Sequence, residues 1–99
     1  MKPKKPKPKR LKLPESLNLN AAAPLAQSLR ALRGSPLVVE ARHVRSVGAQ
    51  CIQVLLSAVG TWKADNVAFE ITAPSPAMIE SLQLLGIAPS ELTMKDMPQ

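Results

Sequence analysis

Ninety-nine residues with 45% hydrophobic content can build one small domain around a single core. A single cysteine rules out a disulfide within the chain, no apolar run approaches the roughly 20 residues needed to cross a bilayer, and the basic N-terminus lacks the apolar segment of a signal peptide. We therefore expect a cytoplasmic protein. Its formal net charge of +6 is not spread evenly along the chain.

The positive charge is concentrated at the N-terminus. Residues 1–13 contain seven Lys or Arg and no acid, which leaves six basic and seven acidic residues for the rest of the chain. A lysine–proline repeat offers little apolar area to bury, so we expect residues 1–10 to be a disordered basic tail and residues 11–99 to form the domain. The tail is either a solubilising arm or an attachment to nucleic acid or an anionic membrane. With one Phe, one Trp and no Tyr, the chain lacks the aromatic platform of single-strand binders, which disfavours nucleic acid.

The first half of the domain shows strand, helix and strand patterns. Apolar residues alternate over 11–13 and 17–19 around a turn-like Pro-Glu-Ser, which predicts a short opening hairpin. Asn20 is placed to cap a helix that runs to Arg33, with leucines at helical spacing and Gly34 as its stop. Pro24 fits this helix only in its first turn. The apolar run 37–39 then predicts a buried strand.

The segment from Gly48 to Trp62 predicts a long helix with two unlike faces. Ile52, Leu55, Leu56, Val59 and Trp62 share one face, and Gln50, Gln53, Ser57 and Thr61 share the other. No charged residue occurs between positions 46 and 62. Because a solvated helix normally carries Lys or Glu on its outer face, we expect another molecule to cover this one.

The second half repeats the strand–helix order. Residues 67–71 alternate as a strand, and Ser75-Pro76 begins a helix that ends at Gly86. Residues 88–99 either add a short strand near 92–94 or lie over the core. The order ββαβαβα predicts a small α/β domain, a mixed β-sheet covered by about three α-helices.

Two segments of this pattern resemble a known family. The first reads V-x-x-V-G-A-Q-C-I-Q-V-L-L from Val44, and the second runs from Thr-Ala-Pro-Ser-Pro to Leu-Leu-Gly-Ile over residues 72–87. Together they resemble the STAS domain, the fold of bacterial anti-sigma factor antagonists, over about residues 11–94. Residues 48–51, Gly-Ala-Gln-Cys, are most similar to the chemotaxis-associated, CheS-type STAS proteins.

The resemblance implies a non-enzymatic adaptor or regulator. Its partner would be a chemotaxis histidine kinase or another ATP-binding protein, and it would modulate phosphate flow to response regulators. An alternative within the family is the STAS subunit of a bacterial phospholipid ABC transporter, which docks on an ATPase. A third alternative is a nucleic-acid or membrane binder that uses the tail.

The sequence departs from the phosphorylated members of that family at one position. Their corresponding helix opens with Asp-Ser-Ser-Gly, and a kinase phosphorylates one hydroxyl there. Gly48 occupies the Asp position and Ala49, which has no hydroxyl, occupies the phosphorylatable one. Ser46 is a weak candidate three residues earlier. We expect a constitutive docking surface without a phosphorylation switch, formed by Arg42, His43, Arg45, Ser46, Gly48, Ala49, Gln50, Gln53, Val54 and Ser57.

Two residues in this region also allow other interpretations. His43, between two arginines, could bind an anion with the N-terminus of the following helix, or it could lie in a solvated loop that faces an acidic partner. Cys51 is either a reactive thiol at a helix start or a small core residue. A Cys51–His43 nucleophile and base would lack a third group, and one His with one Cys supplies too few metal ligands. We therefore expect no enzymatic activity, no cofactor and no metal.

Overall fold

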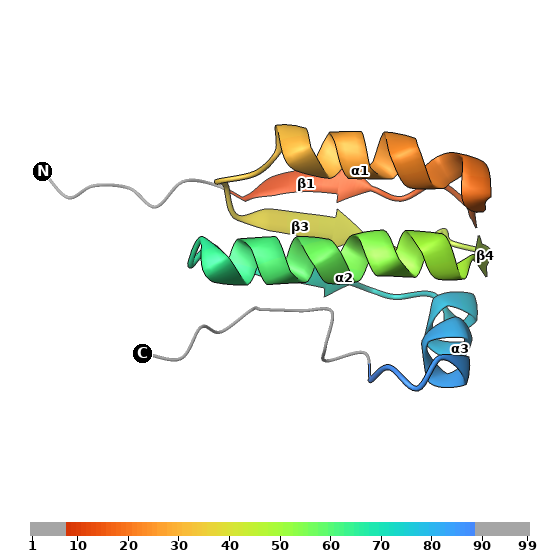
Figure 1. Ribbon diagram of the computed structural model, residues 1–99. Coiled ribbons are helices and arrows are strands. Elements are labelled where there is room, and N and C mark those ends of the chain that lie inside the picture. The colour runs from red at the N-terminus through yellow and green to blue at the C-terminus, as the bar shows by residue number, and fades with distance from the viewer. Residues whose placement is uncertain (1–7, 89–99) are drawn as a thin grey trace, which may run out of the picture.

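Three short strands form the central sheet of the computed structural model, which describes residues 8–88 (Figure 1). Strands β1 (Lys9–Lys12), β3 (Leu37–Glu40) and β5 (Phe69–Thr72) lie in the order β1-β3-β5 and pair in parallel. Figure 1 shows helices α1 (Ala22–Ala31) and α2 (Ala49–Ala64) side by side across one face of this sheet. Helix α3 (Pro76–Leu84) lies beyond the end toward which the strands point.

A second, smaller pairing lies at that same end. Strand β2 (Ser16–Leu17) pairs in parallel with β4 (Ser46–Val47), directly before α2 begins. Gly48 donates its N–H to the Leu17 carbonyl over 2.8 Å, and a side chain at Gly48 would bring its Cβ to 3.3 Å from that oxygen. This close approach fixes where α2 starts.

Side-chain alternation gives the sheet one apolar and one polar face. Leu37 and Val39 of β3 are buried, and the register sets Leu37 beside Phe69 of β5. Since successive side chains of a strand point to opposite faces, Glu40 lies on the other face, where Arg10 donates a hydrogen bond of 3.0 Å to its carboxylate. The helices therefore cover the apolar face.

The core lies between the sheet and α2. Ile52 and Leu55 of α2 are completely buried, as is Phe69 beneath them, and the rings of Trp62 and Phe69 lie 5.5 Å apart at a tilt of 60°. The other buried apolar side chains come from every layer of the fold: Leu13, Leu17, Leu25, Leu29, Leu37, Val39, Ala41, Val44, Cys51, Ala58, Met78 and Leu82.

The predicted small α/β domain with three helices is confirmed, but the opening hairpin is wrong. Residues 9–12 pair with β3, and residues 16–17 pair with β4, so the two segments belong to different sheets. Within residues 8–88 all three strand pairings are parallel. The alternation correctly indicates that Leu13 and Leu17 are buried, but it does not specify which strand each segment pairs with, and Leu19 lies in a 3₁₀ turn and is 66% exposed.

Element boundaries differ from the prediction by a few residues. A 3₁₀ turn (Leu19–Ala21) precedes α1, and the Asn18 side chain, not that of Asn20, accepts a hydrogen bond from the Ala21 N–H. Helix α1 ends at Ala31, three residues before Gly34, whose φ of 92° lies in the left-handed region. The two-residue strand β4 was not predicted. The strand predicted near 92–94 lies outside the described residues.

Deletion of the N-terminal residues should show where the domain starts, because β1 begins at Lys9 and not at residue 11. Removing residues 2–7 keeps the whole of β1 and its pairing with β3, so the melting temperature should hold. Removing residues 2–10 also deletes the 2.8 Å bond from the Lys9 N–H to the Pro36 carbonyl and the Arg10–Glu40 ion pair. Loss of about 1 kcal/mol should lower the melting temperature by at least about 4 °C. Equal melting of the two truncated proteins would contradict this boundary.

Candidate functional site: the α1–α2 groove

The N-terminal turn of α2 is anchored by the segment that precedes α1. Cys51 is completely buried, and its thiol donates a hydrogen bond of 3.4 Å to the Asn18 carbonyl. Burial raises the pKa of the Cys51 thiol, which opposes formation of a reactive thiolate. The interpretation of Cys51 as a small core residue is therefore confirmed.

Helix α2 presents the two faces that its sequence predicts. Leu55 is completely buried, whereas Gln53 and Ser57 are exposed, and Val54 lies half-buried between the two faces. Ala49, in the first turn, is exposed and offers no hydroxyl to a kinase. The solvent-facing side of α2 is thus free of charge from Ala49 to Thr61.

A groove of about 490 Å³ runs between α1 and α2. Its α2 wall carries four of the residues predicted to bind a partner, and its other wall carries Arg30 of α1 and Arg33 just beyond the end of that helix. The lining consists of Ala26, Leu29, Arg30, Arg33, Gln50, Gln53, Val54, Ser57, Ala58, Thr61 and Trp62. The groove therefore combines an apolar floor with uncharged amide and hydroxyl groups and two cations.

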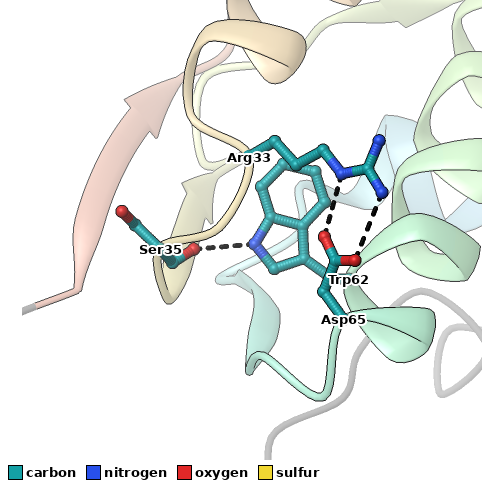
Figure 2. A network of polar contacts seen from close by, with 4 residues as sticks. All are labelled: Arg33, Ser35, Trp62 and Asp65. Atoms are coloured by element: carbon teal, nitrogen blue, oxygen red, sulfur yellow. Dashed lines mark hydrogen bonds and ion pairs between the residues drawn. The ribbon is translucent and has the colours of Figure 1, made fainter.

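Polar contacts close the groove at the C-terminal ends of both helices (Figure 2). Arg33 donates two hydrogen bonds to the carboxylate of Asp65, over 2.9 and 3.2 Å. The indole N–H of Trp62 donates to the Ser35 carbonyl over 2.8 Å. Trp62 lies in the last turn of α2, and Asp65 directly follows that helix. Arg33 and Ser35 follow the end of α1, so these bonds hold the two helix ends together.

The Arg33–Asp65 pair predicts that part of the stability depends on pH. Hydrogen bonding from Arg33 holds the pKa of Asp65 below its ordinary value of 3.8. A carboxyl whose pKa is lower in the folded state stabilises the fold above its unfolded pKa and loses this contribution as the pH falls through the folded one. Asp65→Asn should therefore destabilise the protein at about pH 7 and have a smaller effect at about pH 3. Urea unfolding at both pH values tests this, and an equal loss at the two would contradict it.

The remaining predicted site residues gather elsewhere. Arg42, His43 and Arg45 are exposed in the loop after β3 and line a separate hollow of about 390 Å³ with the first residues of α3. Arg45 lies 3.7 Å from the carboxylate of Glu15, a contact with both side chains largely in solvent. The Ser46 hydroxyl lies 3.3 Å from that of Ser16 across the β2–β4 pair. The predicted surface is thus divided between the groove and this loop.

The sequence prediction missed the α1 side of the groove. Ala26, Arg30 and Arg33 were assigned only to a helix that packs on the core. The signal was present, because residues 16–39 contain no acid and hold both arginines at a spacing of three near the helix end. Such a spacing places two side chains on one helix face.

Residues 8–88 hold no group of three or more His, Cys, Asp or Glu side chains close enough to bind a metal ion. Among the helices in that range, none is long and apolar enough to cross a membrane.

The comparison with known families agrees with the fold and the α2 segment. Residues 1–93 match the family described as "Mlab, STAS domain". No curated protein and no solved structure matched the chain. The match covers nearly the whole sequence, and the chain therefore belongs to the STAS domain family.

Proposed function

We propose that this STAS domain is a constitutive, non-enzymatic docking module that binds its partner across the α1–α2 groove and the adjoining outer face of α2. The observation that carries the proposal is the outer face itself, where Gln53 and Ser57 are exposed yet no charge occurs along four turns of helix. Solvated helices normally carry charges there, whereas a surface that becomes buried in a complex avoids them because an unpaired charge is costly to desolvate.

Two ATP-binding proteins are candidate partners in the cytoplasm. The Gly-Ala-Gln-Cys sequence at residues 48–51 supports a chemotaxis histidine kinase, with the domain acting as an adaptor or regulator of signalling. The family label "Mlab" favours a second candidate, the ATPase of a phospholipid ABC transporter. With either partner, binding would be constitutive at this position, because Ala49 at the start of α2 has no hydroxyl that a kinase could phosphorylate.

Charge substitution on the outer face of α2 should weaken binding without unfolding the domain. Gln53 is exposed, so Gln53→Glu should change the free energy of unfolding by within about 0.5 kcal/mol. In a complex the new carboxylate would be desolvated without a partner, at a cost on the order of 2 kcal/mol, which lowers affinity at least about tenfold. Calorimetric titration against the purified kinase and the purified ATPase measures this.

A matched control is available on α3. Gln83 is also exposed and does not line the groove, so Gln83→Glu makes the same chemical change away from it. This variant should bind as the unaltered protein does. Normal binding by folded Gln53→Glu would move the docking surface to the Arg42–Arg45 loop or the tail. Binding of neither purified protein would reject both named partners.

A further inference from the structure

The charges around the groove are one-sided. Between residues 16 and 64 the chain contains a single acid, Glu40, and that side chain pairs with Arg10 on the face of the sheet opposite the helices. None of the residues that line the groove is acidic, and two of them are arginines. Asp65 lies at the end of the groove, where it pairs with Arg33, so Arg30 is the one unpaired charge among the described residues that line the groove.

The two arginines are in different states. Arg33 is occupied, because Asp65 accepts two hydrogen bonds from its guanidinium. Arg30, one turn earlier on the same wall, is exposed, and no acidic side chain within residues 8–88 forms an ion pair with it. The helix dipole favours a cation in the last turn of α1, where Arg30 lies. This interaction does not use the N–H donors of the guanidinium, which stay available to a ligand.

The floor of the groove is apolar, whereas its border carries a charged side chain. Leu29 and Ala58 are buried, Trp62 is only 2% exposed, and the half-buried Val54 adds apolar surface at the level of the rim. A ligand that fills the groove gains by placing apolar side chains on this floor. A carboxylate next to Arg30 would gain a charge-assisted hydrogen bond, whereas a Lys or Arg there would be repelled.

We infer that the partner inserts an acidic amphipathic segment into this groove, with apolar side chains on the floor and an Asp or Glu against Arg30. This rests on the proposed function and specifies the chemistry of the docked partner. A helix that places its apolar residues in a groove between two helices is an established mode of peptide recognition. The positive border also selects against basic segments of similar shape.

A peptide library identifies the segment without requiring the purified partner. The full chain is immobilised, and binders are selected from a phage-displayed library of random 16-residue peptides with all amino acids equally available. Selected peptides should be enriched in Asp and Glu next to apolar residues. Raising NaCl from about 0.1 M to about 1 M shortens the Debye length from about 10 Å to about 3 Å and should weaken their binding.

Charge reversal at Arg30 then tests the assigned contact. Arg30→Glu should lower the affinity of the selected acidic peptides at least about tenfold, and the neutral Arg30→Gln should lower it less. Lys12→Glu makes the same change of net charge on β1, away from the groove, and should have little effect. A second selection against Arg30→Glu should yield peptides that carry Lys or Arg. Circular dichroism confirms that each variant is folded.

The outcomes separate this inference from the docking proposal. If selected peptides are neutral or basic, or if Arg30→Glu binds them normally while Gln53→Glu does not, the groove binds a partner but the acidic segment is wrong. If acidic peptides bind Arg30→Glu and Gln53→Glu as tightly as the unaltered protein, they bind elsewhere and the assignment of this groove is wrong. A library that yields no binder overturns the acidic segment, while the titrations with purified kinase and ATPase still decide the docking proposal.

Discussion

Leu55→Lys should abolish the cooperative unfolding transition of this protein. Leu55 is completely buried in the middle of α2, between the helix and the sheet. The substitution removes an apolar side chain from the core, at a cost of about 2–5 kcal/mol, and places an ammonium group where it has no partner. A domain of this size has a total stability of about 5–15 kcal/mol, so the loss consumes most or all of it. Thermal and urea unfolding followed by circular dichroism measure the effect.

The matched control introduces the same residue two positions earlier. Gln53 is exposed, so Gln53→Lys should fold and melt within a few degrees of the unaltered protein. The contrast tests the assignment of the two α2 faces independently of any partner. A folded Leu55→Lys with normal melting would mean that α2 is rotated about its axis relative to the arrangement described.

Trp62→Ala should destabilise the domain by about 3–5 kcal/mol. The indole is 2% exposed, packs against the Phe69 ring, and closes the C-terminal end of the groove. Its removal leaves a cavity and deprives the Ser35 carbonyl of the N–H that it accepts over 2.8 Å. Urea unfolding followed by circular dichroism gives the free energy, since the variant has no tryptophan to follow.

Trp62→Phe separates packing from hydrogen bonding. Phenylalanine retains most of the ring but has no N–H, so the expected loss is about 1–3 kcal/mol, much of it from the unsatisfied carbonyl. If the Phe variant is as unstable as the Ala variant, the hydrogen bond dominates. If the Ala variant loses less than about 1 kcal/mol, Trp62 does not seal the core.

The helices were predictable because their signals are local. Ser75 accepts a hydrogen bond of 3.1 Å from the Met78 N–H, so the Ser-Pro start of α3 forms as its residue types predict. The separation of Leu55 from Gln53 and Ser57 on α2 follows from the helical period alone. The match to the STAS family covers these same segments.

The strand pairings and the groove were not predictable in the same way. Residues 9–12 pair with a strand about 28 residues later, and nothing in their alternation specifies that distance. The groove needs two helices that are far apart in sequence, so the α2 residues were predicted from their missing charges while Arg30 was not. The packing between two elements decides which side chains lie next to each other in a site. The spacing of residues within one element contains no information about that packing.

The position of Trp62 also provides an optical probe. It is the only tryptophan in the chain, and its indole forms part of the groove lining. A segment that fills the groove would change the packing and the charges around the indole, so the fluorescence emission of the unlabelled protein should change when the partner binds. The native chain therefore carries its own fluorescent reporter of groove occupancy, at the end of the groove where Arg33 and Asp65 meet.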